Sequence, residues 1–204
     1  TTILNDESSL SFQIFTQDNE GDWQVHVTGQ LSPMRDFEFA EDSDLREIKS
    51  RCQKQISVEN SYSIFQKSGL EYGPAFRALH SVFSGDRELL AEIVLPSGSD
   101  VLNSKYLAHP ILLDNCLQAA GILGGIGVDI KPIYLPISFD RIYVREALSD
   151  RVWCHVRDVT EVGSADKGLT SEITLYNMKG QKIAELSNFK TSPATKSQLL
   201  KILS

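Results

Sequence analysis

The feature that most constrains the fold is an almost wholly apolar stretch from His109 to Leu123. Pro110 fits the first position of a helix, because its missing N–H would have no partner there. The pair Gly124-Gly125 is typical of a helix end. A helix that is apolar on all sides is buried rather than laid on a surface. The sequence therefore predicts a buried central helix that other elements must cover.

Three polar residues interrupt this helix, namely Asp114, Asn115 and Gln118. Asp114 and Gln118 are four residues apart, so their side chains share one helix face. A carboxylate in apolar surroundings is costly unless it is partnered or protonated. Asp114 is therefore the strongest candidate for a chemical role. The alternative is a buried carboxyl group that only hydrogen-bonds nearby backbone, and the spacing is compatible with both.

Segments on both sides of the helix alternate apolar and polar residues, which predicts strands. Residues 8–16 and 23–31 form a predicted β-hairpin around turn residues 18–22. Residues 32–58 are a charged connector with a short helix at 45–53, and a second helix at 59–67 ends before Gly69. Further strands are predicted at residues 77–84, 88–95, 134–144, 151–159, 170–177 and 182–191, followed by a frayed tail from Ser192 to Ser204.

The connections between these strands are short, which implies an antiparallel sheet. A sheet that is apolar on one face has to cover the central helix. A two-stranded hairpin is marginal in water, so the opening hairpin is expected to belong to a larger sheet. The fold class predicted from the pattern is α+β, with an antiparallel sheet around one long helix.

Composition excludes several classes of function. A net charge of −7 without a Lys/Arg cluster argues against binding of nucleic acid. No apolar run approaches the roughly 20 residues that cross a bilayer, and the N-terminus does not form a signal peptide. Cys52, Cys116 and Cys154 lack a CxxC pair and suit reduced thiols in a cytoplasmic protein. No residue spacing indicates a metal, and no glycine-rich loop precedes a helix, so no cofactor is predicted.

Three motifs then resemble a known family, the dehydratase domains of polyketide synthases. Tyr72-Gly73-Pro74-Ala75-Phe76 is similar to the family's YGPxF motif. The run from His109 to Asp114, followed by Gln118, is similar to its HPxLLD and DxxxQ motifs. Leu135-Pro136 with Phe139 is similar to its LPxxF stretch. The resemblance covers about residues 60–192, and the opening hairpin resembles the last strands of the family's first half.

The resemblance implies a double hotdog fold, in which each half is a long helix wrapped by an antiparallel sheet. It divides the chain into a terminal hairpin of a truncated first hotdog (1–31), a linker (32–58), a second hotdog (59–192) and a flexible tail (193–204). The implied reaction removes water from a β-hydroxyacyl chain on an acyl carrier protein and gives an α,β-unsaturated thioester. The implied partners are this carrier protein and neighbouring synthase domains, and a homodimer is left open.

Residue by residue, the resemblance gives Asp114 the role of the acid that assists departure of the β-hydroxyl group. This role is chemically sensible, because hydroxide is a poor leaving group and a carboxyl group on an apolar helix stays protonated more easily. The implied substrate-binding residues are Gln118, Tyr72, Pro74, Phe76, His109, Leu135 and Pro136. His109 is expected mainly to cap or brace the helix start.

The chain departs from the family in one respect, because it contains no HxxxGxxxxP motif, which carries the histidine base. His26 lies in the opening hairpin, and His80 and His155 lie in predicted strands, where packing or surface roles are expected. Three explanations are open: a piece of a dehydratase whose first half is elsewhere, an inactive dehydratase-like structural or dimerisation element, or a relative that catalyses isomerisation or ring closure on the tethered chain. We expect the chain alone to be inactive.

Two other classes remain as alternatives. A single-hotdog thioesterase or hydratase would also place a carboxylate on a central helix, but the YGPxF segment and the opening hairpin argue against it. A pure binding module is the second, with Lys131, Arg141 and Arg145 as candidates for docking an acidic carrier protein.

Overall fold

The computed structural model describes residues 2–6, 9–32, 44–97, 106–125, 133–160 and 168–194. The chain divides into two compact units, Thr1–Asp42 and Ser43–Ser204. No helix among the described residues is both long and apolar enough to span a membrane.

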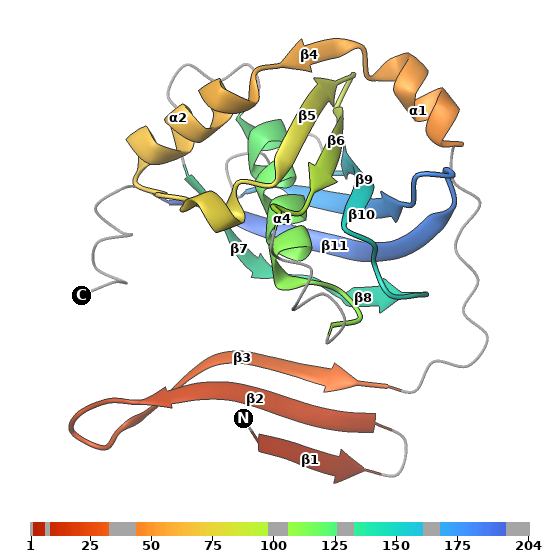
Figure 1. Cartoon of the computed structure of the whole chain (residues 1–204). Coiled ribbons are helices and arrows are strands. Elements are labelled where there is room, and N and C mark those ends of the chain that lie inside the picture. Colours follow the sequence, from red (N-terminus) through yellow and green to blue (C-terminus); the bar gives the residue numbers. More distant parts are fainter. Residues whose placement is uncertain are drawn as a thin grey trace. The chain divides into compact units, whose positions relative to one another are not determined.

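The first unit is a three-stranded antiparallel sheet (Figure 1). Its strands are β1 (Thr2–Asp6), β2 (Ser9–Gln17) and β3 (Trp23–Leu31), in that spatial order. The predicted hairpin is confirmed as β2 and β3. The strand β1 adds to it and was not predicted, because five residues are too few to display a clear alternation.

A β-bulge interrupts the pairing of β2 with β3. Ile14 pairs with Val27 and Phe15 pairs with Val25, with a register shift between the two pairs. The shift leaves His26 of β3 without a register partner on β2, as in a β-bulge. Phe15 contacts Trp23 edge-on, with ring centroids 4.8 Å apart. Trp23, Val25 and Val27 are exposed within the described residues.

The second unit is built on an eight-stranded antiparallel sheet. Six strands follow the order β4-β5-β6-β9-β10-β11, and both β7 and β8 pair with β11. The strands are β4 (Lys54–Ile56), β5 (Leu79–Ser84), β6 (Glu88–Val94), β7 (Ile133–Ser138), β8 (Arg141–Val144), β9 (Arg151–Asp158), β10 (Thr170–Tyr176) and β11 (Lys182–Ala194).

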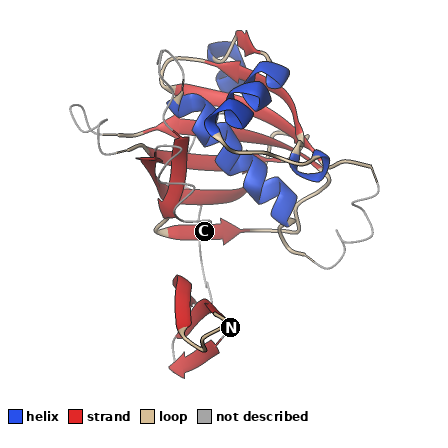
Figure 2. Cartoon of the chain, turned by 90° about the vertical axis from the view of Figure 1, so that its left-hand side faces the viewer, coloured by secondary structure: helices blue, strands red, loops and turns tan. Residues whose placement is uncertain are grey.

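The central helix α4 (Pro110–Gly124) lies along one face of this sheet, as the sequence predicts (Figures 1 and 2). Pro110 occupies the first turn, and the His109 side chain caps the helix by accepting a hydrogen bond from the Ile111 N–H. Leu112, Cys116 and Ala119 are fully buried against the sheet. The helix is therefore the centre of the main hydrophobic core.

A second helix, α2 (Val58–Ser68), packs near the start of β5 and leads into the segment with the YGPxF motif. Ser57 caps its N-terminus, and Gly69 ends it with a φ of 98°, a left-handed conformation that glycine adopts without strain. A short 3₁₀ turn, η1 (Pro74–Phe76), follows and contacts α4. The predicted helix end at Gly69 is confirmed.

The helix α1 (Leu45–Arg51) lies on the opposite face of the sheet, where Leu45 and Ile48 pack with Leu90 and Tyr176. Neighbouring residues of β6 divide between the two faces, because Leu89 belongs to the core around α4 and Leu90 to the core around α1. The sequence predicts a connector over 32–58, whereas α1 buries Leu45 and Ile48 and β4 pairs with β5. Residues 44–58 are thus part of the second unit. The sequence pattern suggested a connector, but a short charged segment can still bury the apolar face of one helix.

Two strand boundaries differ from the sequence prediction. The predicted continuous strand at 134–144 is divided into β7 and β8 at Phe139 and Asp140. Opposite this break, Asn188 has a positive φ of 53° and its Nδ2 donates to Asp140 Oδ2 at 2.7 Å. Residues 192–194, predicted as tail, extend β11 and pair with β7, and residues 195–204 lie outside the described residues.

Candidate active site

A cavity of about 160 Å³ lies beside one face of α4. Asp114, Leu117, Gln118 and Gly121 line it from the helix, and Gly125 lines it just after the helix ends. These positions recur every three or four residues, so they form one row along the helix. Asp114 is the only charged residue that lines the cavity in the described part of the chain.

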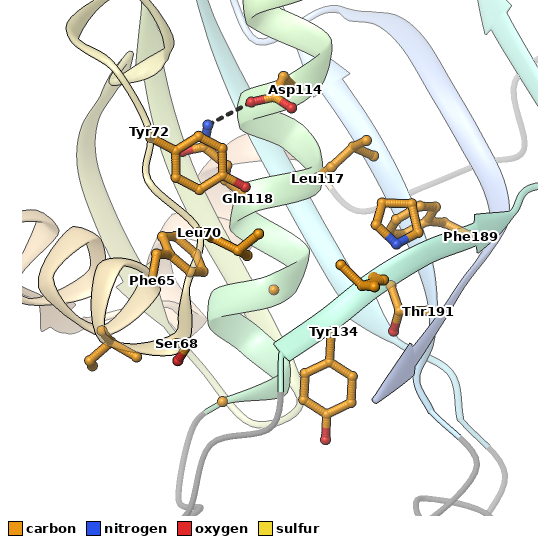
Figure 3. A pocket seen from close by; sticks show the side chains of 15 residues that line it. Phe65, Ser68, Leu70, Tyr72, Asp114, Leu117, Gln118, Tyr134, Phe189 and Thr191 are labelled. Atoms are coloured by element: carbon orange, nitrogen blue, oxygen red, sulfur yellow. Dashed lines mark hydrogen bonds between the residues drawn. The ribbon is translucent and has the colours of Figure 1, made fainter. Parts of the chain in front are cut away.

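Asp114 has one hydrogen-bond partner in the described structure, the amide of Gln118 (Figure 3). Gln118 Nε2 donates to Asp114 Oδ2 at 2.7 Å, as the spacing of four residues predicts. Burial raises the pKa of Asp114 above its ordinary value, and the Gln118 hydrogen bond opposes the rise. A neutral amide cannot compensate a charge as a cation would. The site therefore makes the Asp114 carboxyl group hold its proton more readily than a solvent-exposed aspartate does.

Gln118 also fixes the end of the segment that carries the YGPxF motif. Its Nε2 donates a second hydrogen bond to the Phe76 carbonyl oxygen at 2.9 Å. The Gln118 side chain is fully enclosed, and its Oε1 has no hydrogen-bond partner among the described residues. Because both bonds use the donor side of the amide, the side chain cannot rotate without losing the contact to Asp114.

Asn115 holds the same segment more strongly, although the sequence analysis gave it no role. Its Nδ2 donates to Phe76 O at 3.2 Å and Ile111 O at 2.8 Å, and its Oδ1 accepts from the Ala78 N–H at 3.1 Å. The Tyr62 hydroxyl group also donates to Asn115 Oδ1 at 3.4 Å. This fully buried amide therefore joins three segments. The sequence signal for this role was a polar residue in an apolar helix, directly after Asp114.

Tyr72 lines the cavity beside Asp114, as its motif implies. Its ring contacts Phe65 and Tyr62 edge-on, with centroid distances of 5.4 Å and 6.2 Å. Burial raises the pKa of Tyr72 to about 12, and the Asp114 charge adds to the rise. Tyr72 is therefore a neutral phenol at physiological pH, suited to donate a hydrogen bond rather than to act as a base.

The remaining predicted site residues fall into two groups. Leu135 and Pro136 line the cavity from β7. The side chains of Pro74 and Phe76 are exposed and are not among its lining residues, so Phe76 contributes through its backbone carbonyl. His109 is buried at the start of α4 and does not line the cavity either, which agrees with a bracing role.

The rest of the lining comes from elements that are distant in sequence. The walls around the α4 row are apolar for the most part (Figure 3). They are formed by Ile64, Phe65, Ser68 and Leu70 at α2 and just beyond it, Tyr134 of β7, and Phe189 and Thr191 of β11. The sequence analysis did not identify these residues, because no local pattern distinguishes a wall residue from a core residue.

None of the four histidines lines this cavity, and all four belong to the described residues. His155 lies on the α1 side of the sheet, where its Nε2 is 2.9 Å from Glu88 Oε2. His80 is exposed, and His26 bonds Thr16 in the first unit. Among the docking candidates, Arg141 pairs with Glu185 at 3.6 Å, and Lys131 lies outside the described residues.

Comparisons with known proteins agree with this picture. Residues 40–201 match the sequence model of the family described as polyketide synthase dehydratase N-terminal domain. The polyketide synthase PksN of Bacillus subtilis is 28% identical over 181 residues, which are 87% of this chain and 3% of PksN. The chain thus spans a small fraction of the curated relatives that it matches.

Solved structures show the same fold. The dehydratase domain from the CurJ module of curacin polyketide synthase is 27% identical, with a TM-score of 0.84 over 97% of this chain and 68% of that chain. A trans-AT polyketide synthase dehydratase domain from Brevibacillus brevis is 25% identical, with a TM-score of 0.83 over 94% of this chain and 68% of that one. These similarities identify an α+β, hotdog-like arrangement with an antiparallel sheet, and the chain belongs to the polyketide synthase dehydratase family.

Proposed function

We propose that the second unit is the second hotdog of a dehydratase domain and supplies the general acid, Asp114. The substrate is a β-hydroxyacyl thioester carried by an acyl carrier protein, and the product is the α,β-unsaturated thioester. The observation that carries this proposal is the Asp114 carboxyl group, which is the one charged group among the described residues that line a mainly apolar cavity and which has a neutral amide as its partner. A raised pKa keeps such a group able to donate a proton.

The proposed chemistry balances with one acid and one base. The base removes the α-proton, the electron pair forms the α,β double bond, and the bond between the β-carbon and its oxygen breaks. Asp114 gives its proton to the departing oxygen, which leaves as water. Because Gln118 donates to Oδ2, the proton of Asp114 resides on Oδ1. In this proposal Tyr72, which lines the cavity with Asp114, donates a hydrogen bond to the substrate.

The base has to come from another part of the domain, since no histidine lines the cavity in the described residues. Two observations support the assignment to the second hotdog. The three-stranded sheet of the first unit exposes several large apolar side chains, as expected of strands from a larger sheet. The chain also matches 68% of the CurJ dehydratase domain, so a third of that domain has no counterpart in it. A variant of that domain with histidine replaced by phenylalanine is described as inactive.

The direct test is an assay of a β-hydroxyacyl carrier protein with two proteins, the chain alone and a longer polypeptide that restores the missing part. We expect enoyl product, detected by mass spectrometry of the carrier protein, only from the longer polypeptide. Conversion by the chain alone would show that the site is complete without another base. The longer polypeptide without activity on any substrate would favour the alternative, a dehydratase-like structural element of the synthase.

A further inference from the structure

We propose that Gly121 and Phe65 set the depth of the cavity, and thereby the length of the apolar acyl tail that the site accepts. This inference rests on the proposed function, because it assigns the cavity beyond Asp114 to the part of the substrate that follows the β-carbon. We expect the longest accepted tail to have at most about six carbons, because of the volume of the cavity.

The cavity runs along α4 from the reacting end towards the helix C-terminus (Figure 3). Asp114 and Gln118 lie at one end of the row and Gly121 lies seven residues beyond Asp114. With a rise of 1.5 Å per residue, Gly121 is roughly 10 Å further along the helix axis. Phe65 and Leu70 stand on one side of this path and Phe189 and Thr191 on the other.

Gly121 lacks a structural reason to be glycine. Its φ is not positive, and a Cβ atom built there would meet Phe65 Cε1 at 3.6 Å, an ordinary contact. Gly124 is different, because a Cβ atom there would overlap Leu169 Cδ1. Glycine inside a helix is less favourable than alanine. The missing side chain at Gly121 therefore leaves space in the cavity without a packing constraint that requires it.

The lining decides which part of the substrate fits this space. Asp114, Gln118 and Tyr72 are the polar lining residues at the reacting end. The other polar lining residues are Ser68, Tyr134 and Thr191, and the Thr191 hydroxyl is already bonded to the Leu169 backbone. The pantetheine arm carries amides that each need partners when buried, whereas a hydrocarbon tail needs none. The apolar tail is therefore the better occupant.

The volume sets the length of that tail. A closed apolar cavity of about 150 Å³ accommodates benzene. The cavity of about 160 Å³ beside α4 includes the space next to Asp114, so it holds a tail of at most roughly six carbons. A larger side chain at position 121 would occupy the same space, and a smaller one at position 65 would extend it.

The test uses the longer, restored polypeptide with 3-hydroxybutyryl and 3-hydroxynonanoyl carrier-protein thioesters, which carry one and six carbons beyond the β-carbon. We expect Gly121→Leu to lower kcat/KM for the nine-carbon substrate by about tenfold or more, and that for the four-carbon substrate by less than about twofold. Gly121→Ala should act in the same direction with a smaller effect, and it fits without displacing Phe65. Gln66→Leu on the exposed side of α2 is the matched control.

Equal losses for both substrates in Gly121→Ala and Gly121→Leu, or no loss for either, would overturn the proposal. A second readout does not depend on turnover, namely the binding of benzene followed by NMR shifts of the Leu117 and Leu135 methyl groups. We expect binding in the wild type and in Gln66→Leu and at least tenfold weaker binding in Gly121→Leu. If the wild type converts neither substrate, the proposed function fails, and benzene binding by itself then decides whether Gly121 limits the cavity.

Discussion

Two carboxyl groups of the second unit are withdrawn from solvent, Glu88 fully and Asp114 in part, and they differ in their partners. Asp114 lines the cavity beside α4, whereas Glu88 lies on the opposite face of the sheet under α1. Glu88 accepts two hydrogen bonds from Arg51, at 2.7 Å and 3.0 Å, and lies 2.9 Å from His155. The Arg51 hydrogen bond holds the pKa of Glu88 below its ordinary value, while burial raises the pKa of Asp114.

The difference teaches that the partner, and not burial alone, decides what a carboxyl group can do. A cationic partner keeps Glu88 charged, so it joins α1 to the sheet and has no proton to give. A neutral partner compensates only part of the cost of burying the Asp114 charge, so this carboxyl group holds its proton more readily. The contacts of Glu88 stabilise the fold, whereas Asp114 is able to donate a proton.

The largest expected effect is on turnover. In the restored polypeptide, Asp114→Asn should lower kcat by about 10²- to 10⁴-fold, because the departing oxygen then lacks its proton donor. Glu88→Gln should leave kcat within about twofold, since Glu88 does not line the cavity. Steady-state assays of enoyl product provide the measurement. Full activity of Asp114→Asn would remove the acid role from this residue.

The second effect is on stability, with the order of the two variants reversed. Glu88→Gln should lower the free energy of unfolding by about 2 kcal/mol, because two charge-assisted hydrogen bonds to Arg51 and the contact with His155 are weakened. Asp114→Asn should change it by less than about 0.5 kcal/mol or raise it. Urea unfolding followed by circular dichroism tests both. A larger loss in Asp114→Asn than in Glu88→Gln would contradict the comparison.

A third effect concerns the pKa of Asp114 itself. Gln118→Leu removes the hydrogen bond that favours the carboxylate, so the pKa of Asp114 should rise further. The basic limb of the kcat profile, where the acid loses its proton, should then move to higher pH. NMR of the labelled Asp114 carboxyl carbon measures the same pKa without turnover, with Gln66→Leu as the control. A basic limb that moves to lower pH would show that Gln118 stabilises the protonated form.

The smallest effect is the pH dependence of stability. The folded-state pKa of Asp114 is raised, so its contribution to stability is fully present below 3.8 and is lost as pH rises through the folded value. The pKa of Glu88 is lowered, so its contribution is present above 4.5 and is lost as pH falls. Relative to wild type, the free energy of unfolding of Asp114→Asn should therefore increase as pH rises. The loss of unfolding free energy in Glu88→Gln should be smallest in acid. Urea unfolding between pH 3 and 7 distinguishes these opposite trends.

Much of the site could be predicted because its residues are close in sequence. The helix at Pro110, the cap at His109 and the contact between Asp114 and Gln118 depend on spacings of at most four residues. Such spacings have the same geometry in any helix. The motif at Tyr72 added a residue from outside the helix, and its presence at the cavity agrees with the resemblance.

Other parts could not be predicted, since they depend on pairing between distant segments. Asn115 forms hydrogen bonds with Phe76 and Ala78, which are 37 to 39 residues away in the sequence. Phe189 lines the cavity beside α4 only because β11 is paired into the same sheet. The break at Asp140 depends on Asn188 of another strand. The role of β4 similarly depends on its partner β5.

The amino-acid sequence alone determined the central helix, the antiparallel character of the sheet and the identity of the carboxyl group on the cavity side. These follow from local periodicity and from the cost of burying a charge. Only the tertiary structure decided that Asp114 is partnered by an amide and Glu88 by a cation. The local sequence does not distinguish the two carboxyl groups. The pKa of each depends on charges and on exclusion of solvent, and distant segments provide both.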